Sequence, residues 1–307
     1  MFKQIRFFRI SASSFPSAAA LESALEKTRF KPCAPTEKKS LGWVPPRGNK
    51  YDPLIETVDG QWILRLQVEK KAVPAATLRD AVEKRCQKIE SEQGRKPGRK
   101  EKRELKELCE LELLPRAFSK IGATTIWIDR AAQMLVIGTT SQTACDDIVS
   151  QLIADLSPVI KDVSVTLADT NNSPSAAMTA WLLDYAAPGE FELDRTLELQ
   201  AADESKATVK YNRHNLDVGA VRDQLQSGLV PKSLALSWNN EINLVLGADL
   251  TLKKLELVDL AQNGAADADS QVDSFDADVT IMTGTLRALL PAVAQALGGF
   301  SSPTATV

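Results

Sequence analysis

The chain has 307 residues, 44% of them hydrophobic, which is enough to bury the cores of about two globular domains without metals or disulfides. One histidine, His214, excludes any site that needs a histidine cluster, and Cys33, Cys86, Cys109 and Cys145 are too scattered for a disulfide framework or a zinc-ligand spacing. The net charge is only −3 and no run of about 18 uncharged apolar residues occurs, so we expect a cytoplasmic protein with free thiols, no metal and no cofactor.

The first third of the chain combines strands with one helix. Hydrophobic alternation predicts strands over residues 3–10 and 62–68, and the segment between them begins with a predicted helix over residues 17–27. The stretch SLGWVPPRGNK, residues 40–50, is predicted to be an ordered loop, because Pro45 and Pro46 cannot donate to a strand ladder.

Residues 74–93 and 101–113 have the periodicity of amphipathic helices. Gly94, Pro97 and Gly98 break the pattern between them. The two helices therefore form a hairpin, and its place between sheet-like segments indicates an insertion over residues 74–120 that projects from a body.

From residue 121 onward the patterns of strands and helices alternate. Strands are predicted over residues 124–128, 134–138, 160–167, 191–199, 208–211, 233–238, 242–246 and 252–257, and helices over residues 143–155, 175–184, 218–227 and 285–297. Asn239 and Asn240 are a hairpin-turn signal. The acidic stretch 261–274 is predicted to be a linker, and the end of the chain, residues 301–307, to be disordered.

These elements predict an α+β fold with mixed sheets. Residues 1–73 and 121–186 would form a central body that carries the helical hairpin, and residues 187–307 a second region with antiparallel strands and a C-terminal helix.

Charge is distributed unevenly along the chain. Residues 1–120 carry 26 Lys and Arg against 16 Asp and Glu, whereas residues 121–307 carry 11 against 24, which gives +10 and −13. Such polarity favours an anionic partner for the first half or attraction between halves of different subunits, and chance clustering on solvated faces is the simpler alternative.

The hairpin holds the densest basic run, RKPGRKEKRELK at residues 95–106. A cluster of this kind matches phosphates without reading sequence, because lysine and arginine replace condensed counterions. A solvated helix face is the alternative. The seven cations are Arg95, Lys96, Arg99, Lys100, Lys102, Arg103 and Lys106.

A second basic group lies around KYNRH, where Lys210 and Arg213 are close to His214 and Lys232 follows on a later strand. Tyr211 could stack on a base, but one aromatic residue is far from the platform of a dedicated single-strand binder. His214 is more simply an exposed or hydrogen-bonded side chain than a metal ligand.

Motifs of common enzymes are absent: the chain has no GxxxxGK[ST] loop, no GxGxxG, no HExxH and no GxSxG. We therefore expect no enzymatic activity. Acidic groups such as Asp146 with Asp147 leave a metal-dependent nuclease as an alternative, although surface acids are ordinary solubility features. A protein-interaction adaptor that docks an acidic partner on the basic hairpin is the other alternative.

Four blocks in register resemble the signature of the recombination-associated RdgC family: LGWVPPRG at 41–48, ELLPRAFSK at 112–120, TTIWIDR at 124–130 and FDADVTIMTG at 275–284. The helix EKRCQKIESEQ and the strand SLALSW also match. The resemblance covers nearly the whole chain.

The resemblance implies a homodimer that closes through two interfaces into a ring around a positively charged hole. It implies a nucleoid-associated protein that binds single- and double-stranded DNA with little sequence preference and restrains the RecA recombinase.

Residue by residue, the family's basic helical arm corresponds to Arg95, Lys96, Arg99 and Lys100. Its basic strand and turn correspond to Lys210, Arg213 and His214. Phe118 corresponds to a phenylalanine of one dimer interface, and a core aromatic is the alternative reading. After Gly228 the chain departs from the family pattern, because Leu229 stands where a lysine near the second interface is expected, with Lys232 three positions later.

Overall fold

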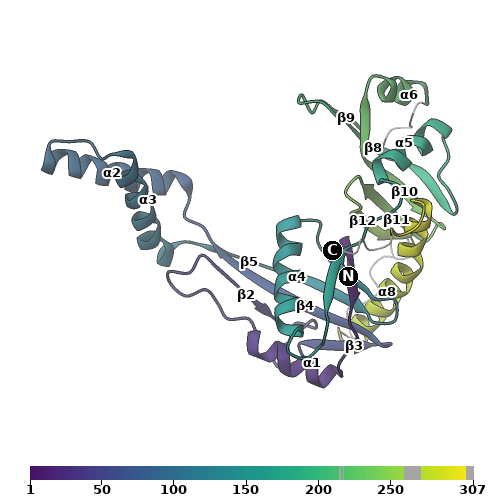
Figure 1. Ribbon diagram of the computed structural model, residues 1–307, viewed down its shortest axis with the longest axis horizontal. Helices are drawn as coiled ribbons and strands as arrows, with labels where there is room; N and C mark the ends of the chain where they lie inside the picture. Colours follow the sequence, from purple (N-terminus) through teal and green to yellow (C-terminus); the bar gives the residue numbers. More distant parts are fainter. Residues whose placement is uncertain (214–215, 217, 259–270, 302–307) are drawn as a thin grey trace. The chain divides into compact units, whose positions relative to one another are not determined.

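A computed structural model of the chain describes residues 1–213, 216, 218–258 and 271–301, and it combines helices with a large antiparallel sheet (Figure 1). This combination confirms the predicted α+β class. None of the described helices is both long and apolar enough to cross a membrane. The chain divides into two compact units: unit 1 contains residues 1–21, 55–63 and those from 125 onward, and unit 2 contains residues 22–54 and 64–124.

Unit 1 is dominated by antiparallel strands. They are β1 (Gln4–Ser11), β3 (Ile55–Val58), β6 (Met134–Ile137), β7 (Ser164–Leu167), β8 (Phe191–Ala201), β9 (Thr208–Tyr211), β10 (Leu229–Trp238), β11 (Ile242–Gly247) and β12 (Leu252–Leu257). β1 lies in the middle, since it pairs with β6 on one edge and with β12 and β7 on the other. The order then continues from β12 through β11, β10 and β8 to β9.

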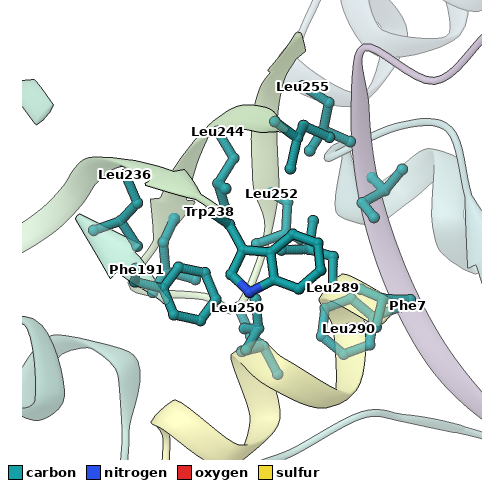
Figure 2. Packing of buried hydrophobic residues seen from close by; sticks show 14 of the residues in the cluster. Phe7, Phe191, Leu236, Trp238, Leu244, Leu250, Leu252, Leu255, Leu289 and Leu290 are labelled. Carbon is teal, nitrogen blue, oxygen red and sulfur yellow. The ribbon is translucent and has the colours of Figure 1, made fainter. Parts of the chain in front are cut away.

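The helices of unit 1 pack on this sheet. They are α4 (Gln142–Leu156), α5 (Pro174–Asp184), α6 (Val218–Gln226) and α8 (Gln271–Ala296), and α1 (Ala18–Leu25) begins in this unit. Figure 2 shows Leu289 and Leu290 of α8 beside Trp238 and Phe191, with Leu252 in the same cluster. All five are at most 7% exposed, and each such buried side chain contributes roughly 1.5–3 kcal/mol to stability.

The turn between β10 and β11 follows from its two asparagines. Asn239 and Asn240 have φ of 49° and 53°, the left-handed values of a type I′ turn, whose twist matches that of the paired strands. Trp238 lies opposite Ile242 at the end of the ladder. The predicted hairpin is confirmed.

An ion pair within unit 1 joins the block TTIWIDR to the C-terminal helix α8. Asp129, at the end of β5 (Ser119–Asp129), is 1% exposed, and its Oδ1 accepts the backbone N–H groups of Ala131 and Ala132 at 3.0 Å. Its Oδ2 lies 2.8 Å from Nε of Arg287 on α8. The aspartate of TTIWIDR thus anchors α8.

Unit 2 is built on β2 (Lys39–Trp43), which pairs with β4 (Gln61–Lys71), and β4 in turn neighbours β5. Both β4 and β5 begin in one unit and end in the other. α2 (Ala75–Gln93) and α3 (Arg99–Leu113) lie side by side (Figure 1). The predicted pair of helices is therefore present.

Three expectations differ from the structure. Residues 40–43 of the predicted loop belong to β2, because the two prolines remove ladder donors only at their own positions. β3 was not predicted. α8 begins at Gln271, so the last four residues of the predicted linker are helical and the helix starts well before residue 285. Residues 261–270 and 302–307 lie outside the described part.

Candidate nucleic-acid interface

The basic run lies where α2 turns into α3, and we call residues 75–113 the arm. α2 ends because Gly94 adopts φ 67° and its N–H donates to the Glu90 carbonyl at 2.9 Å. Gly98, in extended conformation, is the N-cap of α3 and donates its N–H to Glu101. Five residues, 94–98, thus connect the helices and place Arg95 and Lys96 beside the basic first turns of α3.

Three of the seven cations of the basic run, residues 95–106, are paired with carboxylates. Arg95 lies 2.8 Å from Glu101, Lys96 lies 3.7 Å from Glu90, and Arg103 lies 3.2 Å from Glu107; these carboxylate side chains are 32%, 48% and 63% exposed. The hydrogen bonds from Arg95 lower the pKa of Glu101. Exposed pairs of this kind contribute little to stability, so they can open for a stronger partner.

The other four cations of the run, Arg99, Lys100, Lys102 and Lys106, are exposed and form no ion pair with any residue that the structure describes. Positions 99, 102 and 106 are spaced by three and four residues, which places them on one face of α3. This face extends ~10 Å along the helix, whereas phosphates of one DNA strand follow at ~3.4 Å along the axis. It therefore matches about three successive phosphates.

An apolar groove of about 550 Å³ runs beside this cationic face. Lys102 and Lys106 line it together with Leu78, Val82 and Cys86 of α2. The methylene stems of the two lysines can cover apolar surface there while the ammonium groups reach solvent. The packing of α2 against α3 thus orients the cationic face.

The second predicted group lies on three adjacent strands of unit 1. Glu198 of β8 sits opposite Lys210 of β9, and Lys232 of β10 comes alongside at a register shift between Pro231 and Ser233. The Glu198 carboxylate lies 3.3 Å from the Lys210 ammonium and 3.0 Å from that of Lys232. Lys210 and Lys232, both predicted to contact phosphates, therefore form ion pairs with the same carboxylate.

Sequence reasoning missed Glu198, although the antiparallel register of β8 and β9 could have revealed it. Its side chain is 22% exposed. Burial raises its pKa, but the hydrogen bonds and charges of Lys232 and Lys210 outweigh burial and hold the pKa below its usual value. The three groups together carry one net positive charge.

The remaining predicted residues of this region are only partly brought together. Arg213 is exposed just after β9, with φ 52°. His214 lies outside the described residues. Leu229 begins β10 opposite Ala201 and is partly buried against the core. Within the described ranges, no three or more His, Cys, Asp or Glu side chains are grouped so as to hold a metal ion.

Phe118 lies between α3 and β5 and is 93% exposed, so the alternative that it is a core aromatic is wrong. Leu111 and Ile121, on either side of it in the chain, are 47% and 56% exposed. Three large apolar side chains within eleven residues of unit 2 thus face solvent, which is typical of a surface that meets a partner.

Comparison with known proteins identifies the family. The family model described as "Putative exonuclease, RdgC" matches residues 1–300. The chain is 36% identical to the recombination-associated protein RdgC of Bordetella pertussis, 39% to that of Cupriavidus necator and 37% to that of Herminiimonas arsenicoxydans. Each alignment of 299 residues covers 97% of this chain and 98% of the relative. The chain belongs to the RdgC family of recombination-associated proteins.

Proposed function

We propose that this chain binds DNA without sequence preference through phosphate contacts of the arm, and that it restrains RecA by occupying the DNA on which the recombinase acts. The proposal covers single- and double-stranded DNA and a cytoplasmic, nucleoid-associated protein without enzymatic activity. The observation that carries it is the set of four open cations at the start of α3, three of them on one helix face.

The physical driving force is the release of counterions from DNA. Each phosphate that a lysine or arginine neutralises contributes about 0.9 to the slope of log affinity against log salt on duplex DNA. Four contacts would therefore give a slope of about 3.6 from the arm alone. Such contacts position the protein without reading bases, so every sequence should respond alike.

The test is the arm variant Arg99→Gln, Lys100→Gln, Lys102→Gln, Lys106→Gln. Its salt slope should fall by about three to four units, with a similar loss of affinity on every duplex sequence, measured by fluorescence anisotropy from low to moderate salt. The control removes four exposed cations of unit 1: Lys161→Gln, Arg195→Gln, Lys206→Gln and Lys254→Gln.

The control has the same net charge as the arm variant, so an equal fall of slope in both would mean that only overall charge matters. A slope that does not move in the arm variant, with circular dichroism unchanged, would remove the arm from the interface. Arg213, Lys210 and Lys232 would then be the next candidates. RecA-driven strand exchange in the presence of the arm variant should be inhibited less than by the parent protein.

The proposal includes a homodimer that closes into a ring, with the apolar surface around Phe118 at one interface and the region of Leu229 at the other. Phe118→Ser should weaken dimerisation by about 2 kcal/mol or more, because an aromatic anchor in a desolvated contact is a typical hot spot. Light scattering at micromolar protein measures the mass. Tyr51→Ser is the control, since Tyr51 is also exposed, at 88%. A monomeric parent protein would exclude the ring, and an unchanged mass in the Phe118 variant would leave this residue outside the interface.

A nuclease is the second candidate, because the matching family is described as a putative exonuclease. The discriminating measurement is degradation of end-labelled single- and double-stranded DNA after addition of magnesium or manganese. Metal-dependent shortening that co-purifies with the protein would replace the proposal of a binding protein. Competition by plain plasmid DNA separates the binding protein from an adaptor that docks an acidic protein.

A further inference from the structure

A pocket of about 340 Å³ opens in unit 2 beside the turn formed by VPPRG, and none of the arm cations lines it. Its walls include Arg29, Phe30, Pro45, Lys50, Arg65 and Gln67. The family-like block LGWVPPRG thus builds a cavity that the proposed DNA contacts of the arm do not use.

Local chain geometry places the first wall. A Cβ at Gly42 would lie 2.5 Å from the Cα of Phe30, so only glycine lets β2 run this close to residues 28–30. Phe30 donates its N–H to the Trp43 carbonyl at 2.9 Å. Phe30 is half-buried and Trp43 is fully buried, and both line the pocket.

Arg29 holds the opposite loop in place. Its Nη1 donates to the Lys50 carbonyl at 3.1 Å, while Nε and Nη2 donate to the Glu26 carboxylate. These hydrogen bonds lower the pKa of Glu26, which stays ionised and balances the charge of Arg29. Arg29 therefore positions the loop, and its guanidinium is already occupied.

Two other cations line the pocket without an ion-pair partner among the described residues. Arg65 projects from β4, and its Nε is buried without a hydrogen-bond acceptor among the described residues. Lys50 is exposed and has no ion-pair partner among the residues that the structure describes. No aspartate or glutamate lines the cavity. A buried donor without an acceptor calls for an explanation, and an anionic ligand provides one.

We propose that this pocket binds a nucleotide, with its phosphate on Arg65 and Lys50 and its base against Phe30 and Pro45. A cavity of this volume is larger than a phosphate needs, and its apolar wall suits a planar ring. The Gln67 amide can both donate to and accept from a base edge. The nucleotide is either free or the terminal nucleotide of a DNA strand, and the site does not depend on the arm.

Calorimetric titration of the full chain at low salt tests the site with dAMP, deoxyadenosine and inorganic phosphate. We expect dAMP to saturate one site, and both deoxyadenosine and phosphate to bind at least about tenfold more weakly, because each makes only part of the contacts. Arg65→Gln and Lys50→Gln should each weaken dAMP binding by about tenfold. Lys70→Gln is the control, since Lys70 is an exposed cation on the same strand outside the pocket.

The arm variant defined above should bind dAMP as the parent protein does, which separates this site from the proposed DNA interface. In that variant, a 5′-phosphorylated trinucleotide that binds more tightly than dAMP identifies a strand end as the ligand, and the reverse order identifies a free nucleotide. The proposal is overturned if deoxyadenosine or phosphate binds as well as dAMP, if no saturable binding occurs at millimolar dAMP, or if Lys50→Gln and Lys70→Gln have equal effects. Because Lys50 is exposed, its variant keeps the test valid even if Arg65→Gln disturbs folding.

Discussion

The cations of the arm and those of unit 1 differ in the carboxylates that face them. In the arm, the acids paired with Arg95, Lys96 and Arg103 are between 32% and 63% exposed. In unit 1, Glu198 is 22% exposed between two lysines, and Asp129 is 1% exposed beside Arg287.

Because of this difference, lysines and arginines have a structural role in unit 1 and a proposed phosphate-binding role in the arm. If a cation that pairs with a buried acid moves away, the acid is left as an unpaired charge in the protein interior. Such a cation therefore stabilises the fold. A cation that faces a solvated acid, or none, loses little when it turns to a phosphate. The burial of the partner, and not the number of basic residues, therefore separates a ligand surface from a structural one.

The strongest test of this distinction is Arg287→Gln, which leaves Asp129 with only its two backbone donors. We expect a loss of about 3 kcal/mol in the free energy of unfolding, the lower end for a broken buried pair, since Arg287 itself is half exposed. Urea denaturation measures it. Arg195→Gln removes an exposed arginine without an acidic partner in the described part and should cost under about 0.5 kcal/mol. Equal midpoints for the two variants would contradict the structural role of Arg287.

A smaller effect is expected from the acid between the two lysines. Because the pKa of Glu198 is lowered in the folded protein, its ion pairs stabilise the fold above the ordinary glutamate pKa, and this stability is lost as pH falls through the lowered value. Glu198→Gln should therefore lose about 1 kcal/mol at neutral pH and converge with the parent protein in acid.

The measurement is the urea midpoint as a function of pH. Glu192→Gln, an exposed acid on the same strand, serves as control and should follow the parent curve. A gap between Glu198→Gln and the parent protein that widens toward low pH would have the wrong sign and would refute the assigned pairing.

The smallest expected effect is the difference in salt slope between two single variants of the arm. Lys102 and Arg103 are neighbours on α3, but only Arg103 faces a carboxylate, that of Glu107. Lys102→Gln should reduce the salt slope of DNA binding by about 0.9, and Arg103→Gln by less, because part of its charge is already neutralised. Identical slopes for the two single variants would show that exposed pairs open freely on DNA.

Much of this arrangement could be predicted from the sequence. Helical periodicity, with Gly94 and Gly98 as breaks, was sufficient to find α2 and α3, and Asn239 with Asn240 was sufficient to find the β10–β11 turn. β2 was missed because its prolines follow the strand and dominated the local signal. These are local features, which a single sequence records well.

The pairing of charges could not be predicted in the same way. Lys232 reaches Glu198 through a register shift in β10, and Asp129 meets Arg287 from a residue far along the chain. Both depend on tertiary packing, which periodicity does not encode. The exposure of Phe118 was equally hidden, since a phenylalanine after a Pro-Arg turn is as compatible with a core as with a surface.

The central position of β1 has a consequence for how the protein is made. Gln4 and Ile5 lie opposite Lys253 and Leu252, so this end of the early strand gains its partner only when β12 has been translated. At about 5–20 residues per second, ribosomes need roughly 10–50 s to synthesise the intervening chain. The rest of the strand can pair earlier, once β6 and β7 have been translated. The sheet of unit 1 must therefore close late in translation, and a pause in synthesis before β12 would prolong the exposure of the Gln4–Ile5 edge to other chains.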